Sequence, residues 1–438
     1  MKKTLVALAA IAAATGASAQ VSITGYFGAS YDMFSLGNVN SARIGNTSEN
    51  RVSDQSSRLL FNVNEDLGGG LNAIGQMDLR FKVDAAARIQ AEPSYTVPSY
   101  AGGTSAPSVA AATTQQQPAV DPVSNGNIHV GLASKQWGAV RLGRQDVYYV
   151  EQPNLMPAGL FLASNQQPVF HSLATANASR TPNFLWWTSN NYNGFSGQLG
   201  YSTNPLRTSA TSEVEADVGA SGVAAQRKGS GTYYKLNYTQ GALDATVSGI
   251  DYKSDYMGTG AANGTNPAGA AGAGQSANAD QKGTTLVVKY QVTPQLRVAL
   301  GRSDEKQIAV AGASASSAQT STLLATYAAD STIKATSNAA SAAYVMGKNQ
   351  FTINWAKRSN ASVNGVEQAD TGLSQTTFAY NYNFSKNTAV GVMYTEQKTD
   401  ANLVGGLFYQ GNNAYGGQVA GMRGETHKIT SFALRQNF

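Results

Sequence analysis

The residue types that carry enzyme chemistry are scarce in this chain of 438 residues. There is no cysteine, which excludes disulfides, thiolate metal sites and cysteine nucleophiles. The histidines are His129, His171 and His427, and none stands in a pattern such as G-x-S-x-G or H-E-x-x-H. Asp251 and Asp255 lack the spacing and the glycine of a calcium loop. We therefore expect neither an enzyme nor a protein that holds a metal or another cofactor.

The charged residues are the remaining candidates for a function, and they are few. Lysine and arginine total 31 and aspartate and glutamate 26, so 13% of the chain is charged, against roughly 25% in soluble proteins. Hydrophobic residues reach only 42%, and nothing after residue 19 has the apolar run of about 20 residues that a membrane helix needs. The composition therefore suits neither a soluble enzyme nor a helical membrane protein.

The first 19 residues have the features of a secretory signal peptide. Lys2 and Lys3 precede an apolar stretch at 5–14, and Ala17-Ser18-Ala19 supplies the small residues that precede a cleavage site. We expect cleavage after Ala19, which leaves residues 20–438 as the mature chain beyond the inner membrane. The net charge then falls from +5 to +3, because two lysines and no acid are lost. Nucleic acid is therefore not expected as a partner.

The mature chain alternates between apolar and polar residues with a period of two, the period of a β-strand whose two faces differ. The even positions of 378–384 are all aromatic, and the odd positions are Ala379, Asn381 and Asn383. In 76–83 the apolar positions are Met77, Leu79, Phe81 and Val83, and the polar positions are Gln76, Asp78, Arg80 and Lys82. Strands with one apolar and one polar face are typical of a transmembrane β-barrel, which satisfies every backbone group in lipid.

The connections between these strands alternate in length. Tight turns with Gly, Asn or Pro are predicted at 65–70, 134–138, 191–194, 238–241, 292–295, 346–349 and 384–387. Long polar segments lie near 36–55, 85–126, 148–180, 203–230, 257–282, 308–340, 359–374 and 400–424. Seven turns, eight loops and two chain ends predict one domain of sixteen antiparallel strands, with short periplasmic turns and long extracellular loops. The alternative is a soluble sandwich or adhesin, whose apolar faces would be buried between sheets.

In a barrel of this size the inward faces line an aqueous channel, and the sign of the lining charge sets ion selectivity. Parity directs these charged residues inward: Arg58, Asp78, Arg80, Lys82, Arg141, Lys235, Lys289 and Arg435, together with His129, Arg297 and the acids Asp32, Asp84 and Asp244. An Arg or Lys facing lipid at mid-depth would cost roughly 2–4 kcal/mol. The excess of cations predicts a channel for small hydrophilic solutes and ions with weak to moderate anion selectivity. If these charges instead lie paired at the rims of the barrel, they have no net effect on ion selectivity.

Three pieces of the sequence are similar to motifs of a known family. The run SRLLF at 57–61 leads into EDLGGGL at 65–71, the run VRLGRQ occupies 140–145, and the last residue is Phe438. These resemble strand 2 with the first turn, strand 5, and the terminal phenylalanine of general porins from β-proteobacteria, the neisserial type of Gram-negative outer-membrane porin. The resemblance covers the whole mature chain in the order of its elements.

The resemblance implies a homotrimer in the outer membrane, among lipids and lipopolysaccharide, with Phe438 recognised by the outer-membrane assembly machinery. It also implies a third loop, here 150–179, that folds into the lumen, where solutes diffuse passively. This loop holds only one acid, Glu151, so the acidic loop usual in the family is not expected. Arg58 and Arg180 resemble the wall arginines of anion-preferring relatives, and Arg180 joins Glu151 among the candidates. The role of the long loop 85–126 stays open.

A second function remains as an alternative: a substrate-specific channel, or a surface-exposed adhesin or binding barrel. The aromatic residues near the third loop are Tyr148, Tyr149, Phe161, Phe170 and Trp186. They would either form a path for sugars or aromatic acids, or pack the loop against the wall.

Overall fold

The structure is a computed structural model of the chain. It describes residues 20–38, 48–80, 126–146, 181–203, 228–255, 280–308, 332–401 and 426–438, with short pieces at 83, 205, 216–218, 224–226 and 424. The predicted signal peptide, most of the segment 85–126 and the whole of the third loop lie outside these residues.

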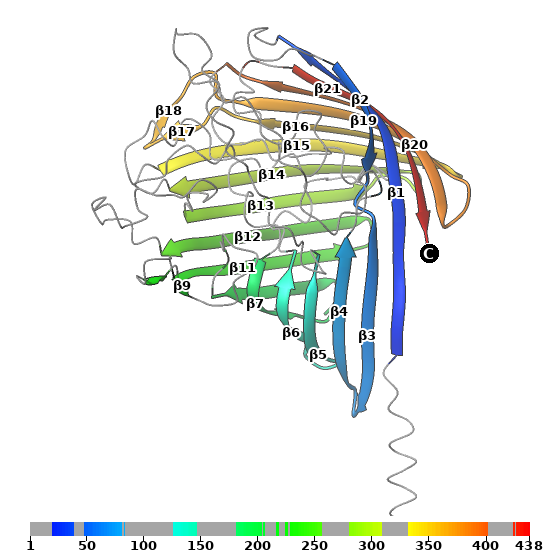
Figure 1. The fold of residues 1–438 in the computed structure, drawn as a ribbon, viewed down its shortest axis with the longest axis vertical. Helices are drawn as coiled ribbons and strands as arrows, with labels where there is room; N and C mark the ends of the chain where they lie inside the picture. Colours follow the sequence, from blue (N-terminus) through cyan, green and yellow to red (C-terminus); the bar gives the residue numbers. More distant parts are fainter. Residues whose placement is uncertain are drawn as a thin grey trace, which may run out of the picture.

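The described strands form one closed antiparallel barrel (Figure 1). Its wall begins with β1 (Gln20–Gly37), and β2 (Ser48–Asp54) and β3 (Arg58–Gly68) together occupy the next place, because each pairs with one half of β1. The wall continues through β4 (Leu71–Arg80), β5 (Ile128–Ser134), β6 (Gly138–Gln145), β7 (Thr181–Thr188), β8 (Phe195–Ser202), β11 (Lys228–Gln240), β12 (Leu243–Asp255), β13 (Asp280–Gln291), β14 (Leu296–Ile308), β15 (Thr332–Met346), β16 (Asn349–Arg358), β19 (Leu373–Asn383), β20 (Thr388–Thr399) and β21 (Thr426–Asn437).

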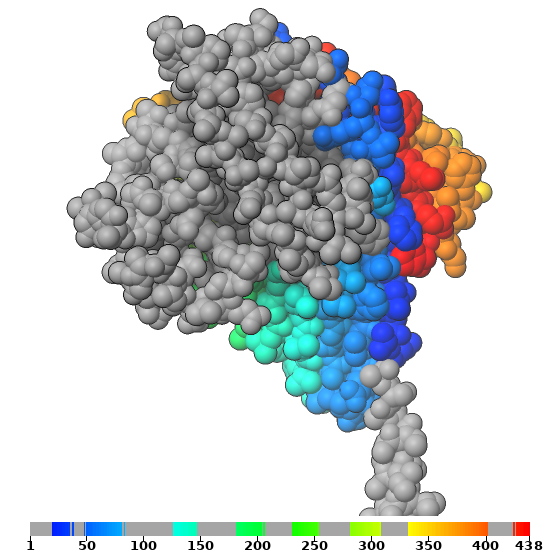
Figure 2. Space-filling view, viewed as in Figure 1, coloured from blue at the N-terminus to red at the C-terminus, as the bar shows by residue number. Residues whose placement is uncertain are grey.

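Pairing of β1 with β21 closes the barrel, so the wall has the sixteen strands that the sequence predicts. In Figure 2, β1 in dark blue lies on the surface between β21 in red and β3 and β4 in lighter blue. The short pairs β9 (Ala216–Val218) with β10 (Ala224–Gln226), and β17 (Ser362–Val363) with β18 (Val366–Glu367), are hairpins within two of the predicted loops.

The two faces of the wall have opposite character. On β19 the side chains of Gln375, Thr377 and Asn381 are buried inside the barrel, whereas Phe378 points outward and is 50% exposed. The same alternation leaves an apolar outer surface on most strands, with exposed residues that include Ile23, Phe27, Leu142, Leu199, Leu236, Leu300, Ile353 and Leu434. A sandwich would bury this face between sheets. The prediction of a barrel is therefore confirmed, and the sandwich alternative is wrong.

Among the described residues, no helix is long and apolar enough to cross a membrane.

All seven predicted tight turns join neighbouring strands. In the first of them Gly68, Gly69 and Gly70 have φ values of +82°, +62° and +80°, which favour glycine. Two loop boundaries are wrong: β2 occupies Ser48–Asp54 within 36–55, and β15 begins at Thr332 within 308–340. The outward residues at these strand ends, such as Asn50 and Lys334, are polar because they lie above the apolar band. The alternation that marks a strand is therefore lost there.

Candidate pore lining

Three arginines come together on the inner wall around Tyr26 of β1, and we call Arg58, Arg80 and Arg435 the arginine group. Strand register places Arg58, the first residue of β3, directly opposite both Tyr26 on β1 and Arg80 on β4. The guanidinium carbon of Arg435 lies 3.8 Å from the centroid of the Tyr26 ring, and that of Arg58 lies 5.3 Å from it. An aromatic face at these distances attracts the cations and holds them toward the lumen.

Two carboxylates neutralise part of this group. Arg80 Nη2 lies 2.9 Å from Asp78 Oδ2 and 2.6 Å from Asp146 Oδ2. Arg58 Nη1 is 3.7 Å from the same Asp78 oxygen. Arg80 is 13% exposed and Asp78 only 1%, so this pairing is sheltered from solvent. Arg435 donates from Nε to Asn437 Oδ1 at 2.9 Å, and no described carboxylate forms an ion pair with it.

A kink between β2 and β3 sets the direction of Arg58. The carboxylate of Asp54 accepts hydrogen bonds from the backbone N–H groups of Ser56 and Ser57. Ser56 has a φ of +64°, and Ser57 Oγ accepts from the backbone N–H of Gly28 on β1 at 3.0 Å. Three residues therefore oppose two on β1, which is a bulge of the kind that redirects a side chain. The sequence gives little sign of this kink.

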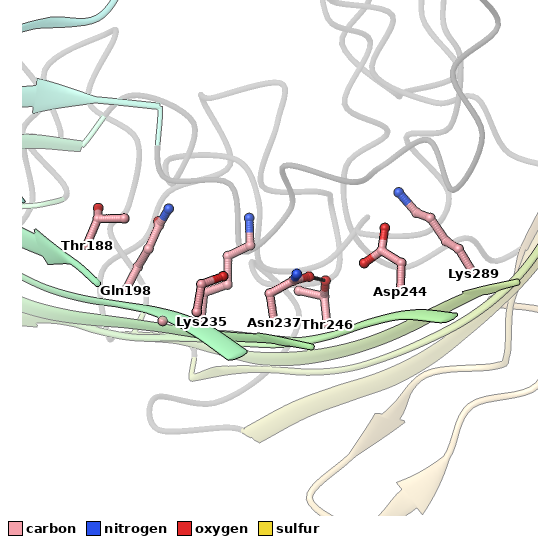
Figure 3. A pocket seen from close by; sticks show the side chains of 9 residues that line it. Thr188, Gln198, Lys235, Asn237, Asp244, Thr246 and Lys289 are labelled. Atoms are coloured by element: carbon pink, nitrogen blue, oxygen red, sulfur yellow. Dashed lines mark hydrogen bonds between the residues drawn. The ribbon is translucent and has the colours of Figure 1, made fainter. Parts of the chain in front are cut away.

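A second cationic region lies on another part of the wall, and we call it the lysine recess. It is a hollow of about 230 Å³ lined by Thr188, Ser196, Gly197, Gln198, Lys235, Asn237, Asp244, Thr246 and Lys289. Figure 3 shows the side chains of Lys235 on β11 and Lys289 on β13 pointing from the sheet toward the same side. Asp244 lies opposite Lys289 and accepts a hydrogen bond from Arg297 Nη2 at 2.9 Å. Three cations therefore accompany one carboxylate.

Arg141 lies between these two regions, next to a cluster of rings. It is opposite Trp186 and donates from Nη1 to Thr188 Oγ1 at 3.2 Å. Trp186 stacks on Phe184 with a centroid separation of 5.2 Å, and His129 meets its edge at 5.3 Å. Because Trp186 is only 4% exposed, its ring packs in the wall instead of offering a surface to a solute. Tyr148, Tyr149, Phe161 and Phe170 lie outside the described residues.

The structure places most of the predicted site residues on the inward face. These are Arg58, Asp78, Arg80, Arg141, Lys235, Lys289 and Arg435. Lys82, Glu151 and Arg180 lie outside the described residues, as do Asp84 and His171. Asp78 faces inward but is covered, so it neutralises arginines and does not itself meet the solvent. Asp32, also predicted inward, is fully buried.

Sequence reasoning missed Asp146 and Tyr26. Asp146 follows the last residue of β6, where alternation has ended, so no pattern signals its contact with Arg80. Tyr26 could have been found from the parity of β1, because Ser22 and Thr24 share its face. The arginine group, Arg141, the lysine recess and its neighbour Arg297 together carry seven cations, and the carboxylates beside them are the three of Asp78, Asp146 and Asp244. No group of three or more potential metal ligands occurs within the described ranges.

A model of the Gram-negative porin family matches residues 5–402. Among solved structures, the anion-selective porin from Comamonas acidovorans is similar at 19% identity and a TM-score of 0.61, over 96% of this chain and 100% of that one. OmpT of Vibrio cholerae in its trimer form is 10% identical with a TM-score of 0.56, over 96% and 100% of the two chains. OmpF of Salmonella typhi in complex with daunomycin is 14% identical with a TM-score of 0.53, over 97% and 98%. A comparison with curated protein sequences found no match.

Proposed function

The chain belongs to the Gram-negative porin family and forms a multi-pass channel in the outer membrane, and from this we propose that its pore favours small anions. The observation that carries the proposal is the surplus of inward cations in these regions of the wall: seven in the arginine group, Arg141, the lysine recess and its neighbour Arg297, against the three carboxylates beside them. Small hydrophilic solutes and ions pass by diffusion, and we propose no catalytic step for the protein.

The charges act on ions through the field inside the channel. A lumen with low-dielectric walls concentrates the field of the charges that line it, and so raises the local concentration of ions of the opposite sign. Arg435 and Arg141 contribute most per residue, because no described carboxylate pairs with them. Arg80 contributes least, since two carboxylates lie within 2.9 Å of it. The similar fold of the anion-selective porin from Comamonas acidovorans supports this reading.

Reversal potentials across a planar bilayer in asymmetric KCl test the proposal. We expect chloride to be more permeant than potassium. Replacing Lys235 and Lys289 together by Gln should lower the preference for chloride. A matched variant, Lys348→Gln, removes a charge from a turn, where Nζ donates to the carbonyl of Phe384, and should change nothing. A wild-type preference for potassium would contradict the proposal.

A conductance that rises linearly with salt is expected for general diffusion, whereas saturation with one solute would favour a substrate-specific channel.

We also propose that the mature protein begins at Gln20 and works as a homotrimer among lipopolysaccharide and other outer-membrane lipids. OmpT, which has a similar fold, has been solved in a trimer form. Phe438 suits recognition during assembly, since its ring is exposed on the outer face beside Phe27, 5.3 Å away, while its backbone pairs with Gly25. N-terminal sequencing of the protein from the outer membrane tests the start at Gln20. The mass of the protein in mild detergent tests the homotrimer. Deletion of Phe438 should lower the amount of folded protein in the membrane.

A further inference from the structure

Three lysines stand side by side on the outer face of the barrel. Lys282 on β13 is the register partner of Lys306 on β14, which is in turn the partner of Lys334 on β15. We call them the lysine row. Their neighbours along each strand, such as Gln281, Glu305 and Ile333, are buried inside, so the row points outward. It lies at the ends of these strands that adjoin long connections, which is the extracellular side of a porin.

The nearby acids leave this row with a positive charge. Lys282 Nζ lies 3.0 Å from Asp251 Oδ2. Asp304 also faces outward near the row and already accepts two hydrogen bonds of 2.9 Å from Arg302 and one of 2.7 Å from Thr336. No described carboxylate forms an ion pair with Lys306 or Lys334. Like charges directly opposite on adjacent strands repel, so the row is a site that a polyanion would stabilise.

An apolar surface begins immediately below the row. Arg302 is opposite Leu286 on β13, and both face outward with Leu300, which is 66% exposed. Cations therefore border the lipid-facing band on β13 and β14, the strands that lie side by side in Figure 1. Neighbouring strands are about 4.8 Å apart, so the row spans about 10 Å across its three strands. This spacing suits an amphiphile with more than one phosphate, with acyl chains that cover the leucines below.

We propose that the lysine row and Arg302 bind the phosphorylated headgroup of lipopolysaccharide. The inference rests on the proposal above that this lipid is a partner, and it places the contact on named residues. It does not depend on anion selectivity, since the row faces away from the lumen. A phospholipid has a single phosphodiester and meets only part of the row. The diphosphorylated lipid A headgroup matches both its charge and its width.

Binding of lipid A to the purified full-length trimer in detergent tests the proposal. The probes are diphosphorylated lipid A, the same lipid without phosphates, and phosphatidylglycerol. Because each lysine near an anionic lipid surface contributes about 1 kcal/mol, the double variant Lys306→Gln with Lys334→Gln should bind diphosphorylated lipid A about 10- to 30-fold more weakly at low salt. Asp251→Asn frees Lys282 from its ion pair and should tighten binding about fivefold, by the same constant.

The matched control removes two lysines from the opposite rim. Lys135 and Lys386 lie in tight turns, and their replacement by Gln should leave lipid A binding unchanged within twofold. Equal binding by the row variant and this control would overturn the proposal, as would equal binding of the dephosphorylated lipid or of phosphatidylglycerol. Reversal potentials of the row variant should equal those of the wild type. A shift there would contradict the outward placement of the row, whereas a cation preference of the wild type would contradict only the proposed function. If the double variant does not fold, Lys334→Gln and Asp251→Asn carry the same test.

Discussion

Arg435 offers the sharpest test of how the lumen selects ions. Its guanidinium lies 3.8 Å from the Tyr26 ring centroid and donates a hydrogen bond to the neutral side chain of Asn437. The change Arg435→Ser therefore removes a cation from the lumen without leaving any of the described carboxylates unpaired. Arg435→Lys keeps the charge but loses the planar group that stacks on Tyr26.

The size of the effect follows from Coulomb's law. For an ion that passes at about 7 Å, one unit charge contributes about 0.6 kcal/mol in water, and screening at 0.1 M salt reduces this to about 0.3 kcal/mol. Removal of the charge raises the energy of chloride and lowers that of potassium by this amount. The permeability ratio of chloride to potassium should thus fall about threefold, since 1.36 kcal/mol corresponds to a factor of ten.

Single-channel reversal potentials in asymmetric KCl measure this ratio. Arg435→Ser should lower it about threefold at 0.1 M and by less at 1 M, where the Debye length is about 3 Å. Arg435→Lys should keep the ratio close to the wild-type value. A ratio that does not change in the serine variant, or that falls equally in the lysine variant, would refute the argument that the charge of this residue acts on the passing ion.

The remaining predictions concern stability and packing. Arg80→Ser leaves the sheltered carboxylates of Asp78 and Asp146 without their shared partner, so it should cost about 3–5 kcal/mol of stability, measurable by urea unfolding in detergent. The control Arg435→Ser should cost much less, and equal losses would contradict this reading of the pairing. Gly200→Ala should destabilise the barrel by about 1–3 kcal/mol, because the added Cβ would lie 2.1 Å from Phe184 Cζ. Gly347→Ala is the comparison in the same unfolding assay. A Cβ there would meet nothing within 4 Å but φ is +58°, so a loss of stability in this variant reports backbone strain and not a clash.

The sequence could predict the faces of the wall because lipid imposes a strict rule on every strand. Phe378 must face outward if Gln375 and Thr377 face inward, and the same parity places Lys235, Lys289 and Arg435 in the lumen. Turn residues such as Gly68 mark where a hairpin reverses, because glycine adopts a positive φ without strain. Strand number and strand face therefore both follow from local patterns.

The contacts between distant strands could not be predicted in this way. Arg80 and Asp146 lie 66 residues apart, and their ion pair requires the register of β4, β5 and β6. Parity predicts that Asp78 faces inward, but its burial depends on the segment near Gly126, whose backbone pairs with it. The extracellular ends at β2 and β15 could not be predicted, because lipid no longer constrains the outward residues there. Lys334 of the lysine row lies at one of these ends, and only the cross-strand register places it beside Lys306 and, through Lys306, Lys282.

β13 shows how one register determines both proposed functions. Successive side chains of a strand point to opposite faces of the sheet. Lys282 and Lys289 are seven residues apart, an odd number, so Lys282 lies on the outer face and Lys289 in the lumen. A slip by one residue would exchange the faces and expose Lys289 to lipid, at a cost of roughly 2–4 kcal/mol near mid-depth. The turn after β13 resists such a slip, since Thr293 Oγ1 accepts hydrogen bonds from the backbone N–H groups of Gln295 and Leu296. The pairing of β13 with β14 therefore fixes which lysine meets the passing anions and which meets the lipid phosphates.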